Sequence, residues 1–179
     1  VHLGLDHLPN IYCGVAVFVL LPLYIMCSKV NAREKIGKCV ILLIFLTAFN
    51  LNIPNYIWHG MHFPNSLPCR QSFIYIFFLL AMCYEAVINL KNSTNRQLGA
   101  SLWIAIGLLL IMEELFINSE TEYSFKSVYI SGIFILIYGL LMFIHNNAKF
   151  KIPVVLMLTF SVSIIECTMN MDATGIGTT

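Results

Sequence analysis

The sequence predicts an all-α fold, a polytopic bundle of about six transmembrane helices. Its composition is 59% hydrophobic and only 11% charged, with a mean hydropathy of +0.82. Soluble domains carry about 25% charged residues, so this chain lacks the polar surface that a soluble protein needs. Apolar runs close to the length of a membrane helix, about 20 residues, recur along the chain. The positive charges also alternate from one connection to the next, as they do in multi-pass membrane proteins.

The first three predicted membrane helices cover residues 11–27, 36–52 and 71–90. The first is apolar and contains Pro22, which membrane helices tolerate with a kink. The third is apolar except for Glu85 near its inner end. A carboxylate inside a membrane indicates function by default. At this depth, Glu85 can reach headgroups or pair with a nearby lysine, and we favour this structural role.

The last three predicted membrane helices cover residues 98–117, 128–145 and 152–170. Short polar connectors join most of the helices. The exception is the loop 53–70, which holds three prolines, three aromatic residues and two histidines. We find no internal repeat or linker, and the chain 1–179 is predicted to form one transmembrane domain.

Positive charge sets the predicted orientation. One set of connectors and helix ends holds eight basic residues, which are Lys29, Arg33, Lys35, Lys38, Lys91, Arg96, Lys149 and Lys151. The opposite set holds only Arg70 and Lys126. The positive-inside rule places the richer side in the cytoplasm. Both ends of the chain and the 53–70 loop are therefore predicted to be extracytoplasmic.

Charge and chain ends narrow the possible roles. A net charge of +1 gives no indication of a nucleic-acid partner. Val1 is not an initiator and no signal peptide precedes the first apolar run, so we expect an internal piece of a longer protein. The six cysteines form no CxxC pair, which favours small hydrophobic packing residues. A disulfide among Cys13, Cys69 and Cys167 is the alternative.

The predicted topology brings most groups with useful chemistry to the outer face. These polar or acidic residues are Asp6, His7, Asn55, Tyr56, Trp58, His59, His62, Asn65, Arg70, Glu113, Glu114, Glu166 and Asp172. Arg70 stands against the charge bias at the outer entrance to the third helix. Its guanidinium can bind phosphate oxygens bidentately, or it can serve as a snorkelling interfacial anchor.

The aromatic and histidine residues of the loop also have two interpretations each. Tyr56 and Trp58 fit the aromatic belt of a membrane interface, or a platform on which a sugar ring or an isoprenoid stacks. His59 and His62 are three residues apart and would share one face of a helical turn. They suit hydrogen bonding or proton transfer, structural capping of the loop, or less readily a metal site, since no placed carboxylate or second cysteine accompanies them.

Three stretches carry a resemblance to a known family. The central one is Asn55-Tyr56-Ile57-Trp58-His59-Gly60-Met61-His62-Phe63-Pro64-Asn65, followed by Leu67-Pro68 and Arg70. The others are residues 8–14 with 33–35, and the closing residues 174–179. Together they resemble the bacterial YfhO membrane protein family over nearly the whole chain. Cys69 and Gln71 depart from the aromatic residues expected beside the arginine.

The resemblance implies a GT-C-like, polyprenyl-phosphate-dependent glycosyltransferase with an extracytoplasmic active site, of which this chain would be a fragment. Such an enzyme moves a sugar from undecaprenyl phosphate to a cell-envelope polymer such as lipoteichoic acid. The matching positions, which are expected to bind substrate, are Trp58, His59, His62, Asn65 and Arg70, with Tyr56 beside them. The catalytic base is expected upstream of Val1, or at Asp6 within this chain. No cofactor is expected, and a requirement for a divalent cation stays open.

Two other classes of function remain open from the sequence. A transporter or flippase for a lipid-linked sugar would use the same outward-facing groups but needs a polar path across the membrane. The predicted cytoplasmic half offers few buried polar residues besides Glu85, which argues mildly against that path. A non-catalytic membrane scaffold is the third class, and it would tolerate the loss of Arg70 or His59.

Overall fold

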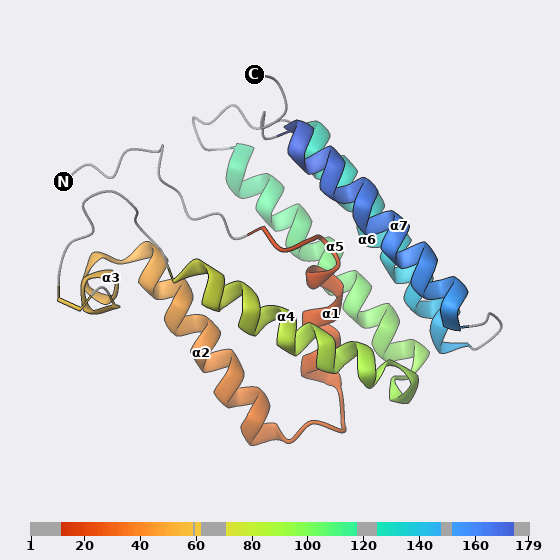
Figure 1. Ribbon diagram of the computed structural model, residues 1–179, viewed down its shortest axis with the longest axis horizontal. Coiled ribbons are helices and arrows are strands. Elements are labelled where there is room, and N and C mark those ends of the chain that lie inside the picture. Colours follow the sequence, from red (N-terminus) through yellow and green to blue (C-terminus); the bar gives the residue numbers. More distant parts are fainter. Residues whose placement is uncertain (1–11, 59, 62–70, 118–124, 148–151, 174–179) are drawn as a thin grey trace. The chain divides into compact units, whose positions relative to one another are not determined.

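A computed structural model describes residues 12–58, 60–61, 71–117, 125–147 and 152–173 (Figure 1). Its elements are α1 (Val17–Met26), α2 (Ala32–Asn50), α3 (Asn52–Trp58), α4 (Ser72–Ile88), the 3-10 turn η2 (Leu90–Asn92), α5 (Asn95–Ile117), α6 (Phe125–Asn146) and α7 (Ile152–Ala173). Every regular element in these ranges is helical, which confirms the predicted all-α class. The chain divides into two units. Unit 1 comprises Val1–Cys13 and Ser28–Met82, and unit 2 comprises Gly14–Cys27 and Cys83–Thr179.

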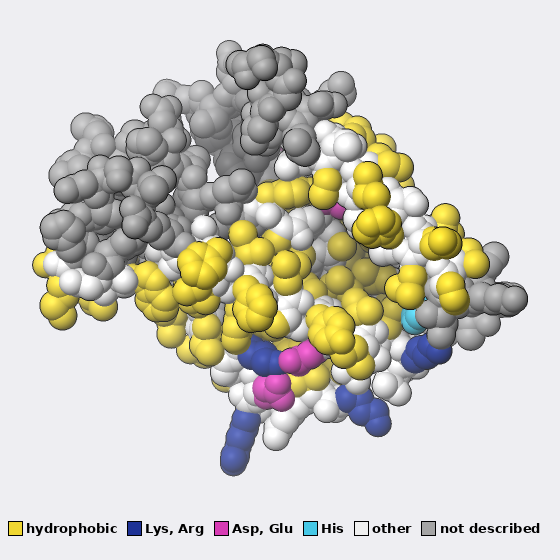
Figure 2. Space-filling view, viewed as in Figure 1, with side chains coloured by type: hydrophobic (Ala, Val, Ile, Leu, Met, Phe, Trp, Pro, Cys, Tyr) yellow, Lys and Arg dark blue, Asp and Glu magenta, His cyan; other side chains and the backbone are white. Residues whose placement is uncertain are grey.

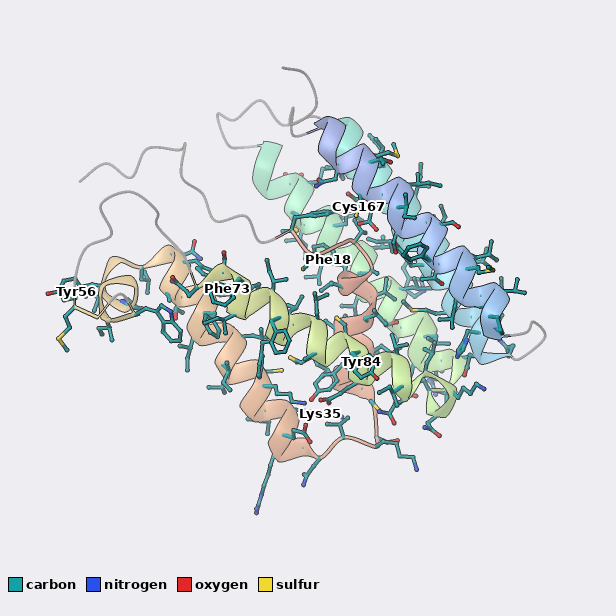
Figure 3. The ribbon with its side chains drawn as sticks, viewed as in Figure 1. Phe18, Lys35, Tyr56, Phe73, Tyr84 and Cys167 are labelled. Carbon is teal, nitrogen blue, oxygen red and sulfur yellow. The ribbon has the colours of Figure 1, made fainter. Side chains whose placement is uncertain are left out.

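In unit 1, α2 begins at Ala32, four residues before the predicted start at residue 36. Asn31 caps the helix, because its side chain accepts a hydrogen bond from the backbone N–H of Arg33 at 3.3 Å. Glu34 lies in the first turn and pairs with Lys38 at 2.6 Å. Capping and this ion pair therefore stabilise helix in a charged stretch that hydropathy alone assigns to a connector. Figure 3 shows Lys35 near the same end of α2.

The second half of unit 1 differs from the prediction. Residues from 53 onwards were predicted as loop, but Asn52–Trp58 form the short helix α3. Pro54 falls in its first turn, where a missing N–H disturbs no hydrogen bond within the helix. After α3 the backbone turns at Gly60, whose φ of 68° lies in the left-handed region that commonly follows a helix end. The predicted loop is thus wrong for its first residues.

Unit 2 is built on three long helices, and α6 packs against both α5 and α7. The stretches Asn95–Glu114, Val128–Asn146 and Pro153–Asn170 are each long and apolar enough to cross a membrane. Leu102 of α5 lies against Gly139 of α6, so the two helices approach where a side chain is absent.

The remaining helix of unit 2, α1, packs against α5 and α6. It has only ten residues and spans about 15 Å, half the thickness of the hydrocarbon core. The prediction of helix from residue 11 was therefore too long at its start. Gly14 has a φ of 93°, which ends any continuation of the helix towards the N-terminus. At the other end of α1, the Gln97 amide donates to the carbonyl of Met26 at 3.0 Å.

The surface of the described helices is largely apolar (Figure 2). Large hydrophobic side chains stand exposed on α4, α5 and α7, among them Phe77, Trp103 and Phe160. Such faces would aggregate in water but suit contact with lipid tails. Burial in unit 2 is instead concentrated in a cluster that includes Val19, Ala105, Phe134, Ile135 and Tyr138.

Candidate functional site

The structure describes two of the seven residues that the sequence predicted to form a site. Tyr56 and Trp58 lie on α3, and Figure 3 shows the Tyr56 side chain extending from this helix. The other five predicted positions lie outside the described residues. They are Asp6, His59, His62, Asn65 and Arg70, and their roles stay predictions.

Trp58 belongs to a set of four side chains in unit 1 that we call the aromatic cluster: Phe45, Phe49, Trp58 and Tyr75. The rings of Phe45 and Trp58 are 4.9 Å apart between centroids and meet edge to face at 64°. Tyr75 of α4 meets Phe49 at 5.5 Å and Phe45 at 6.3 Å, again edge to face. Edge-to-face contacts stabilise aromatic pairs beyond the area they bury. The cluster therefore ties α3 and the start of α4 to the end of α2.

The Trp58 side chain is supported on one side and open on another. Phe45 is buried, whereas Trp58 remains 44% exposed. A supported, partly exposed indole can present its face to a sugar ring or to an isoprenoid chain. It also fits an aromatic belt at the membrane interface. The geometry is compatible with both predicted interpretations and adds a fixed support that sequence reasoning did not foresee.

Gln71 stands at the first turn of α4. Its carbonyl accepts hydrogen bonds from the backbone N–H groups of Ile74 at 3.1 Å and Tyr75 at 3.3 Å. The residue is only 2% exposed. Neither the amide oxygen nor the amide nitrogen of its side chain has a hydrogen-bond partner in the part of the chain that the structure describes. In the sequence, Gln71 stands out only as an expected departure from the family pattern.

A second polar group lies inside unit 2, around Glu166 of α7. This carboxylate is 5% exposed. Its Oε1 accepts a hydrogen bond from the backbone N–H of Val15 at 2.6 Å, and its Oε2 accepts one from the Tyr138 hydroxyl at 2.5 Å. The Ser163 hydroxyl lies 3.2 Å from the Tyr138 hydroxyl. The four residues come from three segments that are distant in sequence.

The contact with Val15 gives an acceptor to a backbone N–H that lies two residues before α1 begins. An apolar environment offers no other acceptor to such a group. Glu166 supplies this acceptor. It lies in α7, four residues before the end of the candidate span Pro153–Asn170. The sequence suggested an acid or base at a helix end. The structure shows this carboxylate buried and accepting hydrogen bonds from two donors.

The other predicted acidic candidates are more dispersed. Glu113 is half-buried and Glu114 is exposed, both near the end of α5. Across the described ranges, no three histidine, cysteine or acidic side chains gather closely enough to hold a metal ion. Cys27 and Cys83 are buried, in keeping with the predicted packing role of the cysteines.

The family model described as "Bacterial membrane protein YfhO" matches residues 2–178. No curated protein and no solved structure matches the chain.

Proposed function

Because this chain belongs to the YfhO family of bacterial membrane proteins, we propose that it forms part of a multi-pass glycosyltransferase of the cell envelope. The enzyme would move a sugar from undecaprenyl phosphate to a polymer such as lipoteichoic acid on the extracytoplasmic face. The observation that carries the proposal is the Trp58 ring, held on Phe45 with part of its surface open. Trp58 directly precedes His59, and His62 and Arg70 follow later in the predicted loop.

The nature of the donor fits a site at the end of membrane helices. A polyprenyl tail stays among lipid chains, so its phosphate and sugar must lie at the interface. The exposed apolar faces of the helices suit contact with the tail. Trp58 and Tyr56 would stack on the sugar, while His59, His62 and Asn65 would hold its hydroxyls. Arg70 would bind the phosphate bidentately.

The proposed reaction is a displacement at the anomeric carbon. A hydroxyl oxygen of the acceptor forms a bond to C1 of the sugar, and the bond between C1 and the phosphate oxygen breaks. Polyprenyl phosphate leaves with the electron pair, and Arg70 would stabilise its developing charge. A carboxylate takes the proton from the acceptor hydroxyl. Asp6, or a residue outside this chain, would supply that base.

The proposal is tested by transfer in membrane vesicles that contain the full-length protein, a teichoic acid acceptor and radiolabelled sugar on undecaprenyl phosphate. Wild type is compared with Arg70→Ala and Arg70→Lys at matched protein levels. We expect label in the polymer with wild type and a loss of about 100-fold with Arg70→Ala. The lysine variant should recover only part, because an ammonium lacks the bidentate fork.

Two outcomes would contradict this proposal. Sugar-lipid that crosses the bilayer without any transfer to polymer would favour the transporter or flippase. Normal assembly with neither transfer nor crossing, unchanged in Arg70→Ala, would favour the scaffold.

A further inference from the structure

The unpaired amide of Gln71 is the feature of unit 1 that packing alone does not explain. A primary amide offers two donors and an acceptor oxygen. Native proteins pair nearly all such groups once they are buried, because an unmade hydrogen bond opposes folding. Gln71 is 2% exposed, and both polar atoms lack a partner within the described residues. A buried group that is unsatisfied in the protein alone is a candidate for satisfaction by a ligand.

The position of Gln71 relates it to the aromatic cluster. Gln71 and Tyr75 are four residues apart at the start of α4, so they share one face of the helix. Tyr75 contacts Phe45 and Phe49, and Phe45 carries Trp58. The amide thus lies one helical turn from the aromatic cluster, on the same face.

The chemistry of the open atoms selects the class of ligand. A phosphate accepts hydrogen bonds and would satisfy only the amide N–H groups. Neighbouring hydroxyls of a sugar donate and accept, so they satisfy both sides of the amide at once. The apolar face of a sugar suits an exposed aromatic ring, and Trp58 of the aromatic cluster is 44% exposed. The combination fits a carbohydrate better than a bare phosphate.

We infer that Gln71 is a substrate-contacting residue whose amide binds hydroxyls of the lipid-linked sugar, beside the aromatic cluster. This inference rests on the proposed function and adds a sugar-binding residue to those that the resemblance implies. It also predicts an unusual pair of effects. Removing the amide stabilises the unliganded protein and weakens sugar binding.

The test uses the full-length protein in lipid nanodiscs and a matched pair of variants. Gln71→Met has a similar length without polar atoms. Gln97→Met makes the same change at the other glutamine, whose amide is bonded to the Met26 carbonyl at 3.0 Å and to the Thr94 N–H at 2.9 Å. The probes are geranylgeranyl phosphate carrying glucose or N-acetylglucosamine, and geranylgeranyl phosphate alone. Thermal unfolding and the Kd of each probe are measured.

We expect Gln71→Met to raise Tm by about 2–4 °C, because an unpaired buried amide is gone. The same variant should reduce the preference for sugar-bearing over bare lipid by about tenfold. Gln97→Met should lower Tm, since it loses formed hydrogen bonds, and leave the sugar preference unchanged. These opposite changes in Tm separate a ligand-binding amide from a structural one.

A lower Tm in Gln71→Met would overturn the inference, because Gln71 would then have structural partners. An unchanged sugar preference in that variant would overturn it as well. If either of these results is obtained and wild type still transfers sugar to polymer, the proposed glycosyltransferase stands. Only the proposed contact between Gln71 and the sugar is then wrong. If wild type neither transfers sugar nor prefers sugar-bearing lipid, the proposed function fails with it.

Discussion

The carboxylate of Glu166 accepts a hydrogen bond from the backbone N–H of Val15 at 2.6 Å, although 151 positions separate the two residues. The contact joins α7 to the segment that enters α1. It gives an acceptor to a backbone donor that water would satisfy in a soluble protein. The segment that leads into α1 is therefore held by a side chain of α7.

Removing the Glu166 acceptor should destabilise unit 2. We expect Glu166→Leu to lower the free energy of unfolding by about 2–4 kcal/mol, since the Val15 N–H and the Tyr138 O–H both lose the carboxylate as an acceptor. Glu166→Gln should fall between this variant and wild type, because its amide oxygen can still accept from one donor. Thermal unfolding in nanodiscs measures the stability of wild type and of both variants. Equal stability of the leucine variant and wild type would show that the carboxylate does not support α1.

The hydroxyl of Tyr138 should contribute a smaller, separate share. Tyr138→Phe removes the hydrogen bond to Glu166 Oε2 and should cost about 1–2 kcal/mol. Tyr129 on the same helix is 66% exposed, so Tyr129→Phe should change stability by less than about 0.5 kcal/mol. Unfolding of the two variants under identical conditions gives the comparison. Matching losses would assign the effect to a general change in α6.

The close approach of α5 and α6 should depend on Gly139. A Cβ at this position would fall on the Leu102 side chain, which must then move. Gly139→Ala should therefore be about 1–3 kcal/mol less stable than Gly132→Ala, because both changes gain the same helix propensity but only the first overpacks. Gly132→Ala is the control, since a Cβ there would meet Leu109 Cδ2 at 3.6 Å, an ordinary contact. An alanine at 139 that is as stable as the one at 132 would contradict the packing argument.

Trp58 should matter for transfer rather than for membrane anchoring. Trp58→Ala should raise the KM for the lipid-linked sugar by about tenfold, the upper range for an aromatic contact, and Trp58→Phe should restore part of it. The other tryptophan, Trp103, is 76% exposed on α5, and Trp103→Ala is the matched control. Kinetics of sugar transfer with all three variants give the answer. Equal effects of both alanine variants would return Trp58 to the aromatic belt.

Hydropathy predicted the long helices well because crossing a bilayer requires a length that composition reveals. The helix predicted at 128–145 is observed at Phe125–Asn146, and the one at 152–170 is observed at Ile152–Ala173. The predicted start of α2 was wrong, because capping and an ion pair stabilise helix outside the apolar run. Asn31 and the Glu34–Lys38 pair extend α2 into a charged stretch, and hydropathy counts those residues only as polar.

The short helices were harder to predict for different reasons. α3 has seven residues and contains Pro54, so neither length nor propensity distinguishes it from a loop. The late start of α1 follows from Gly14, whose positive φ cannot be read from an apolar pattern. Apolar composition therefore predicts a longer helix than the structure shows.

The sequence singled out Trp58 of the aromatic cluster but not the buried amide of Gln71. Trp58 stood out because an aromatic residue in the predicted outer loop fits either the membrane interface or a stacking platform. The importance of Gln71 depends on burial without a partner, which is a property of the folded chain and not of its residue type. Tyr138 was missed similarly, since it counts as one more hydrophobic residue until its hydroxyl meets Glu166.

The most direct test of the account is the side on which sugar transfer occurs. Sealed right-side-out and inside-out vesicles containing the full-length protein are loaded with labelled undecaprenyl-phosphate sugar, and a membrane-impermeant teichoic acid acceptor is added outside them. The account predicts labelled polymer with right-side-out vesicles and none with inside-out vesicles until detergent opens them. Labelled polymer only with inside-out vesicles, or with neither kind even in detergent, would contradict an extracytoplasmic glycosyltransferase.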